Sequence, residues 1–135
     1  MKSVKVHTDG ACRGNPGESG AGAVVTDHDG NVLLKVSRYL GQGTNNQAEY
    51  EALIIGLEAA HGLGADEVSV YADSELMVRQ MKGEYKVKNP GLRDRVAMAH
   101  LILSKFRRHS FHHVPREKNA VADGLANEAI DKRTA

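Results

Sequence analysis

The chain has 135 residues, 41% of them hydrophobic and 26% charged, and a formal net charge of only +1. This length fits one domain over residues 1–135, and the balance excludes a disordered chain or a strongly basic one. A single cysteine, Cys12, excludes an internal disulfide, and no apolar run has the length of a membrane span. We therefore expect a cytoplasmic protein with no membrane association.

The first part of the chain predicts three short strands in an antiparallel meander. Residues 3–8 alternate between apolar and polar, and the Asp-Gly pair at 9–10 predicts a turn that ends this strand. The segment 12–20, rich in glycine, predicts a loop, and residues 21–27 and 32–40 predict two further strands joined by a second Asp-Gly turn.

From residue 46 the apolar residues recur at helical spacing, which predicts a core helix. Its start has the spacing of a capping box, in which Asn46 caps the helix and Glu49 reaches back to it. Residues 68–72 then predict a strand with Asp73 at its end, followed by a helix over about 75–82.

The remainder alternates in the same way. A basic connector, a longer helix from Leu92 to Phe106, a strand over 110–114 parallel to the one before it, a charged loop and a helix from Val121 to Ile130 complete the chain. A meander followed by alternating helices and strands predicts a single α/β or α+β domain.

Four acidic residues each lie beside an apolar run: Asp9, Glu49, Asp73 and Asp123. Each also has a structural explanation, since acids are common in turns, in capping boxes and in the first turn of helices. If the strands that carry Asp9 and Asp73 are neighbours, however, the two carboxylates meet at the strand ends, and a helix packed on the sheet can add Glu49.

Such a cluster would need cations, because crowded carboxylates repel one another in a medium of low dielectric constant. Oxygen ligands without companion cysteines or paired histidines favour Mg²⁺, or alternatively Mn²⁺, over zinc. Two such ions about 3.5 to 4 Å apart activate water and stabilise the leaving oxygen of a phosphodiester. The acids therefore favour a metal-dependent nuclease.

Four segments, in chain order, closely resemble type 1 ribonuclease H. They are TDGACRGNPG at 8–17, TNNQAE at 44–49, DS at 73–74 and NAVADGLA at 119–126. The resemblance extends from residue 4 to about residue 130. It implies the α/β ribonuclease H fold, a five-stranded mixed sheet with helices on both faces, and a two-metal-ion endonuclease. Such an enzyme cuts the RNA strand of RNA/DNA hybrids and leaves 5′-phosphate and 3′-hydroxyl ends.

The resemblance also implies site residues. Asp9, Glu49, Asp73 and Asp123 match the family's metal-binding acids, and His113 matches a histidine that assists water or product, although its neighbour His112 is an alternative. The substrate-binding positions of the family fall on Cys12, Arg13, Asn15, Asn45 and Asn46. Amide groups can recognise the 2′-hydroxyl of RNA, whereas taken alone these residues would be explained by turns and capping.

Two departures from familiar bacterial members stand out. The long basic extension that contains Trp is absent, which predicts weak, salt-sensitive binding with Lys82, Lys86, Lys88 and Arg93 as partial substitutes, and resembles archaeal members. In addition, Glu75 stands where bacterial members carry Gln. A module that binds hybrids without cutting them, and a nuclease for double-stranded RNA or another duplex, remain the alternatives. No dimer seam is evident in the sequence, so we expect a monomer.

Overall fold

A computed structural model describes residues 2–134. Their five strands form one mixed sheet in the order β3-β2-β1-β4-β5. β1 is antiparallel to β2, and β2 to β3, whereas β4 is parallel to both β1 and β5. This confirms the predicted meander followed by parallel strands. The strands are β1 (Ser3–Gly14), β2 (Gly17–Thr26), β3 (Val32–Gly43), β4 (Glu67–Ala72) and β5 (Arg108–His113).

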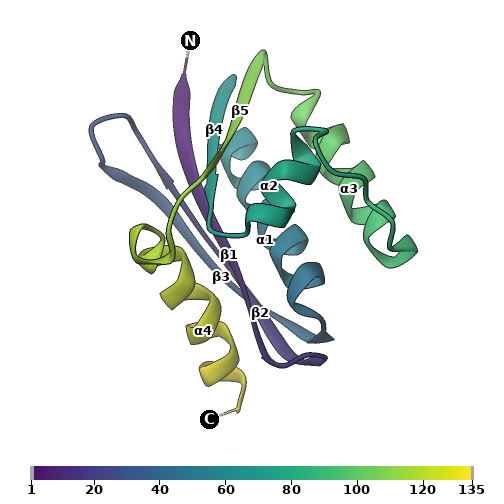
Figure 1. The fold of residues 1–135 in the computed structure, drawn as a ribbon. Helices are drawn as coiled ribbons and strands as arrows, with labels where there is room; N and C mark the ends of the chain where they lie inside the picture. The colour runs from purple at the N-terminus through teal and green to yellow at the C-terminus, as the bar shows by residue number, and fades with distance from the viewer. Residues whose placement is uncertain (1, 135) are drawn as a thin grey trace.

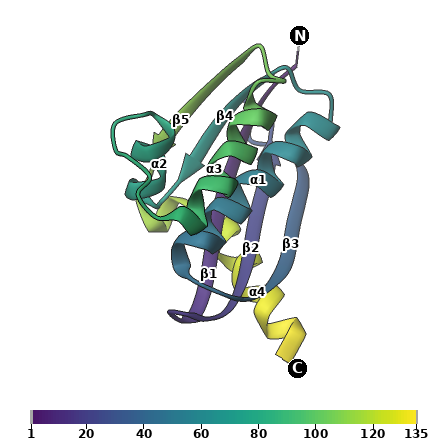
Figure 2. The same ribbon diagram turned by 90° about the vertical axis from the view of Figure 1, so that its right-hand side faces the viewer.

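Helices cover both faces of the sheet, as predicted. The first long helix packs on β1 and β2, with the third helix on its outer side, and the last helix packs on the opposite face over β1, β2 and β3 (Figures 1 and 2). These helices are α1 (Asn45–Gly62), α2 (Glu75–Met81), α3 (Pro90–Leu103) and α4 (Ala120–Thr134), with a short 3₁₀ helix, η1 (Arg116–Lys118), before α4.

The main core lies between the sheet and α1. The alternating side chains Val4 and Val6 of β1 are fully buried there, together with Leu53 and Leu57 of α1 and Val70 of β4. Removing an aliphatic side chain of this size from water contributes about 1.5–3 kcal/mol. The apolar spacing seen in the sequence therefore becomes the contact between the two layers.

The prediction that the first strand ends at Asp9 is wrong. β1 continues to Gly14, because residues 5–14 all pair with β2, including Asp9 with Gly22. The predicted glycine-rich loop is mostly strand as well: β2 begins at Gly17, and the tight turn between the strands contains a cis peptide bond before Pro16. The Asp-Gly pair at 9–10 therefore lies in the middle of β1 and does not form a turn.

The predicted capping box is also wrong. Thr44, not Asn46, caps α1: its extended backbone precedes the helix, and its hydroxyl accepts a hydrogen bond from the N–H of Gln47 at 3.2 Å. The Gln47 side chain accepts from the N–H of Thr44 in return, at 3.0 Å. Because Gln47 completes the cap, Glu49 is left free for another role.

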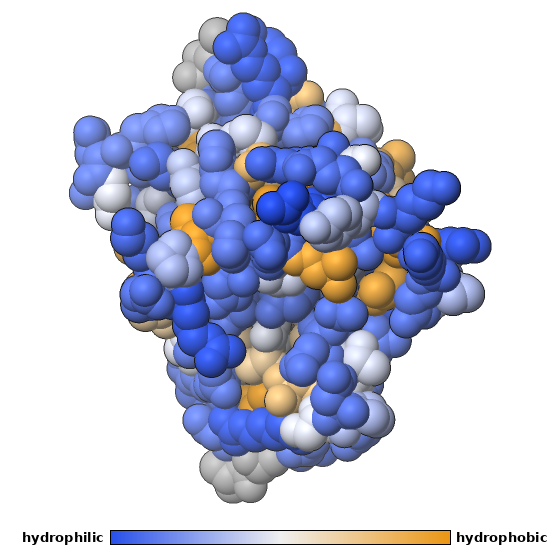
Figure 3. All heavy atoms as spheres, in the orientation of Figure 1, coloured by the Kyte–Doolittle hydropathy of each residue, from blue (hydrophilic) through white to orange (hydrophobic). Residues whose placement is uncertain are grey.

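Smaller differences concern element ends. β3 extends to Gly43, β5 starts at Arg108 and ends one residue before Val114, and α3 begins at Pro90. Phe106 lies beyond α3 but still in the core. Hydrophilic side chains predominate on the face shown in Figure 3. Within residues 2–134 none of the helices has the length and apolar character needed to cross a membrane.

Candidate metal centre and nucleic-acid surface

Asp9 and Asp73 meet because β1 and β4 are parallel neighbours. Thr8 of β1 pairs in register with Ala72 of β4, and each of these two residues is followed in the chain by one of the two acids. β1 continues past this point while β4 ends, and Asp73 lies where the chain leaves the sheet for α2. The parallel register, which the sequence could only suppose, thus brings together residues 64 positions apart in the chain.

Glu49 joins them because α1 lies very close to β1 at Gly10. A Cβ atom on Gly10 would lie 2.3 Å from the backbone carbon of Ala48, so a side chain at this position would collide with the helix. The N–H of Gly10 donates to Oε1 of Glu49 at 3.2 Å. The glycine after Asp9 is therefore required for helix contact rather than for a turn.

Asp123 approaches from the opposite face. Gly22, the cross-strand partner of Asp9, has α4 packed on it so closely that a Cβ there would lie 2.2 Å from the carbonyl oxygen of Ala122. This contact places the first turns of α4 beside Asp9, and the Asp123 carboxyl interacts with that of Asp9. Asn127 donates to Oδ1 of Asp123 at 3.4 Å, which orients the carboxyl from the next turn.

The cluster is crowded and poorly hydrated. One carboxylate oxygen from each of Asp9, Glu49 and Asp73 lies within 4.8 Å of the others. Asp9 is 4% exposed and Glu49 is 9% exposed. Burial, followed by the nearby charge of Glu49, raises the pKa of Asp9 well above its usual range. Burial likewise raises the pKa of Glu49.

A hard divalent cation fits this arrangement. Oε2 of Glu49 and Oδ2 of Asp73 are buried and have no hydrogen-bond partner among residues 2–134. Buried polar atoms are rarely left without partners, and a carboxylate leaves its charge uncompensated as well. Oxygen donors alone suit Mg²⁺ or Mn²⁺. We therefore take Asp9, Glu49 and Asp73 as the candidate metal centre, with Asp123 at its border.

The sequence patterns assign Asn119 no role in the site, although it is the first residue of the segment at 119–126 that resembles ribonuclease H. It is almost fully buried, and its side-chain amide donates to the carbonyl oxygen of Thr8 at 2.9 Å. The backbone carbonyl of Asn119 accepts a hydrogen bond from the N–H of Asp123 at 3.1 Å. Asn119 thus connects the backbone next to Asp9 with the helical turn that carries Asp123. A polar residue directly before an apolar helix was the available signal.

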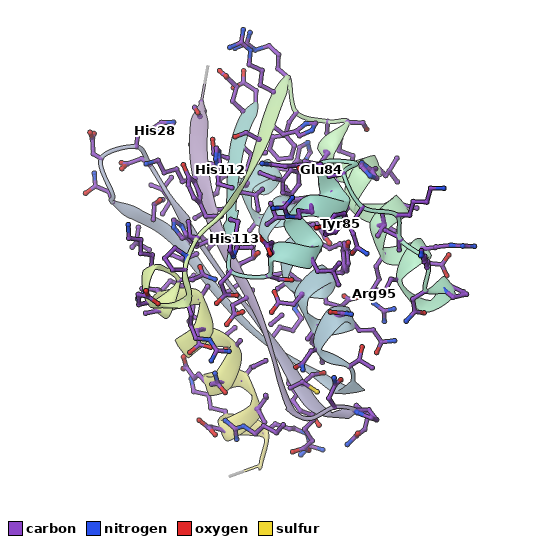
Figure 4. All side chains as sticks on the ribbon, in the orientation of Figure 1. His28, Glu84, Tyr85, Arg95, His112 and His113 are labelled. Atoms are coloured by element: carbon purple, nitrogen blue, oxygen red, sulfur yellow. The ribbon has the colours of Figure 1, made fainter. Side chains whose placement is uncertain are left out.

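The two candidate histidines on β5 lie in different surroundings (Figure 4). His112 stacks on Tyr71 with ring centroids 4.7 Å apart, and its Nε2 lies 2.9 Å from the hydroxyl of Ser110. His113 pairs in register with Ala72, the residue before Asp73, and both histidines are exposed. Successive residues of a strand face opposite sides, so only one of the two can face the acids.

The expected substrate residues gather at the far end of the hairpin, beside the start of α1. The Sγ of Cys12 lies 3.2 Å from the carbonyl oxygen of Gly43, and Oδ1 of Asn15 accepts from the N–H of Asn45 at 3.1 Å. Asn45 and Asn46 are exposed in the first turn of α1. Arg13 differs, because its guanidinium forms an ion pair with Asp131 of α4 at 2.6 Å.

The remaining departures also have defined places. Glu75 opens α2 with an exposed carboxylate that pairs with Arg79 at 3.4 Å. The basic residues of the predicted substitute surface are all exposed on the connector between α2 and α3 and at the start of α3: Lys82, Lys86, Lys88 and Arg93. They lie along the chain between the end of α2 and the first turns of α3.

A five-stranded mixed sheet with helices on both faces, and carboxylates from β1, α1, β4 and α4 converging at one place, defines the ribonuclease H class of fold. A model of the reverse transcriptase-like family matches residues 7–129. The chain is 43% identical to ribonuclease HI of Halobacterium salinarum, over 95% of this chain and 64% of that protein. It is 47% identical to the bifunctional protein Rv2228c of Mycobacterium tuberculosis, over 95% of this chain and 35% of that protein.

Among solved structures, LC11-RNase H1 in complex with an RNA/DNA hybrid superimposes with a TM-score of 0.92 and 50% identity, covering 98% of this chain and 99% of that one. The chain belongs to the type 1 ribonuclease H family. It spans only about a third of the length of the mycobacterial relatives it matches, and about two thirds of the archaeal one.

Proposed function

We propose that the chain is a metal-dependent endonuclease that hydrolyses the RNA strand of RNA/DNA hybrids and leaves 5′-phosphate and 3′-hydroxyl ends. The observation that carries this proposal is the convergence of Asp9, Glu49 and Asp73 within 4.8 Å, with two buried carboxylate oxygens unpartnered. Family membership, and the hybrid bound by LC11-RNase H1, support the substrate class.

In this proposal two Mg²⁺ ions, replaceable by Mn²⁺, are held by Asp9, Glu49, Asp73 and Asp123. When bound, they supply an activated water and stabilise the leaving oxygen. Glu49 is oriented by the N–H of Gly10, and Asp123 by Asn127. These contacts hold the carboxylates in place before substrate arrives, which limits the reorganisation needed in the reaction.

His113 is the proposed proton carrier at the border of the site. Imidazole gains and loses protons near neutral pH, so it can accept a proton from water or pass one to product. His112 is less suited, because its ring is stacked on Tyr71 and its Nε2 is next to Ser110.

Recognition of the hybrid is assigned to the hairpin end and the start of α1. Asn15, Asn45 and Asn46 offer amide groups that can both donate to and accept from a 2′-hydroxyl. Cys12 and Arg13 lie beside this surface. Cys12 contacts Gly43, and Arg13 forms an ion pair with Asp131. The exposed basic segment between α2 and α3 adds phosphate contacts, so binding should weaken with salt.

All of these groups come from one chain, so a single copy of one domain suffices for the proposed reaction. The strands of the described residues form one sheet, and residues 1 and 135 of the proposed domain lie outside the described range. The single cysteine is consistent with a reducing, cytoplasmic location.

The test is cleavage of strand-labelled RNA/DNA, RNA/RNA and DNA/DNA duplexes by the purified protein with Mg²⁺, with Mn²⁺ or with chelator. We expect metal-dependent cleavage of only the RNA strand of the hybrid, and loss of nearly all cleavage in Asp73→Asn. The matched control is Asp29→Asn, which removes the same charge from an exposed turn. Cleavage of double-stranded RNA at the same rate would replace the proposed substrate, and retention of the hybrid without cleavage in any metal would refute the enzyme.

A further inference from the structure

Helix α3 carries an exposed stripe that the fold and the metal centre do not use. Met98 is 47% exposed and Leu101 is 59% exposed, among the largest exposures of apolar side chains in the described residues. Asp94 and Lys105 are exposed on the same side, at spacings of four, three and four residues along the chain. This spacing places Asp94, Met98 and Leu101 on one face of α3, as in the seam of a coiled coil. Lys105 lies in the turn after the helix ends at Leu103, and it lines the same groove as the other three.

The stripe borders a groove between α3 and α1. Glu51, Ile54 and Glu58 of α1 form its other wall. Arg95 is already used there, because it pairs with Glu51 at 2.8 Å (Figure 4 labels Arg95). Asp94 and Lys105, by contrast, form no ion pair within residues 2–134. The groove is lined neither by the three acids of the metal centre nor by Asp123 at its border.

The stripe is complementary to itself. Asp94 lies four residues before Met98, and Lys105 lies four residues after Leu101, so the pattern repeats in reverse with the sign of the charge exchanged. When two such helices run antiparallel about a two-fold axis, Met98 of one faces Leu101 of the other, and each Asp94 faces a Lys105. An Asp94–Lys105 pair of opposite charges then lies at each end of the contact, and Met98 and Leu101 are covered at its centre.

We propose that a second copy of this chain docks on α3 in this antiparallel arrangement, forming a two-fold symmetric homodimer. The contact is centred on one helix per copy, so it falls at the small end of specific interfaces, below about 1,200 Å² in total, where association is weak and transient. The charge pairs at the two ends determine the relative orientation of the two copies more than the strength of their association. The metal centres of both copies remain outside the contact.

The test is sedimentation velocity of the full chain from micromolar to near-millimolar concentration. We expect wild type to shift toward the dimer mass with increasing concentration. Asp94→Lys should abolish the shift, since each Lys105 then faces a lysine, and Lys105→Asp should abolish it by bringing two aspartates together. Equal mixtures of the two variants should form dimers again, because every end then pairs opposite charges, and the double variant should dimerise alone.

The controls make the same charge changes elsewhere. Asp29→Lys, in the turn between β2 and β3, and Lys35→Asp, on β3, should dimerise as wild type does. Circular dichroism verifies that each variant is folded. A wild-type monomer at every concentration would overturn the proposal and leave the groove to a different partner. Dimers that survive in both single variants, or a mixture that fails to restore them, would overturn the antiparallel α3 contact.

Discussion

At the scale of single residues, the acids of the metal centre act against stability. Asp9 and Glu49 are nearly buried, and both have raised pKa values because burial disfavours their charged forms. When the cluster is ionised in the metal-free protein, its carboxylates repel one another, and a bound cation would remove this repulsion. Function and stability are therefore opposed at these positions.

Asp9→Asn should stabilise the metal-free protein at about pH 8, by about 2 kcal/mol in the free energy of unfolding, while removing activity. The ordinary pKa of the Asp9 carboxyl is 3.8 and the folded state raises it. Below that value the carboxyl is protonated in both the folded and the unfolded state, so no advantage is expected at about pH 3; the advantage should grow as pH rises toward the folded pKa. Thermal melts at both pH values, with Asp29→Asn as control, measure the difference. An Asp9→Asn variant less stable than wild type at the higher pH would make Asp9 a structural residue.

His113→Ala should lower turnover by about tenfold or more, with little change in KM, since a proton carrier acts in the reaction rather than in binding. His112→Ala is the matched control on the same strand. It removes a ring stacked on Tyr71 and should leave turnover unchanged, with a loss of stability of at most about 1 kcal/mol. Steady-state rates of hybrid cleavage by both variants test this prediction. A greater loss of turnover in His112→Ala than in His113→Ala would make His112 the proton carrier.

At the scale of secondary-structure elements, two glycines decide how closely the helices approach the sheet. Gly10 admits α1 from one face and Gly22 admits α4 from the other, next to the same aspartate. The helices that carry Glu49 and Asp123 thereby reach Asp9 from opposite sides. Strand β1 serves as the common support, which explains why it continues through the site instead of ending there.

Gly10→Ala should therefore destabilise the fold by about 2–4 kcal/mol and reduce metal-dependent activity, because its methyl group would overlap the backbone of Ala48. Gly62→Ala, near the end of α1, makes the same chemical change where nothing lies within 4 Å, and should be neutral or stabilising. Chemical denaturation and cleavage rates of both variants test this. Equal stability of the two would show that α1 can move away from β1 without cost.

At the scale of the whole molecule, metal binding and folding are coupled. The ligands come from the start, middle and end of the chain and meet only in the folded state, so an ion that binds there stabilises the fold. Asp9 and Glu49 bind protons with raised affinity, so protons and cations compete for these two ligands.

We expect Mg²⁺ at about a hundred times its dissociation constant to stabilise the protein by about 2.7 kcal/mol at about pH 8. At about pH 4, where Asp9 and Glu49 are protonated in the folded state, Mg²⁺ should raise Tm much less. Differential scanning calorimetry with and without the ion measures both, and chelator should reverse the shift. A shift of equal size in Asp73→Asn would place the ion elsewhere.

The sequence by itself determined the fold class and the order of the elements, because apolar periodicity and local motifs depend on neighbouring residues. It also singled out four acids, of which the structure brings Asp9, Glu49 and Asp73 together. It failed at Asp9-Gly10 and at Asn46, where local patterns predicted a turn and a cap. There the pairing of β1 with β2 outweighed the turn signal, and Thr44 made the better cap.

Only the tertiary structure decided which residues meet. The parallel register of β1 and β4, the close approach of α1 and α4 at two glycines and the burial of Asn119 all depend on contacts between segments distant in the chain. Patterns among neighbouring residues do not specify these contacts, because packing between distant segments of the folded chain determines them.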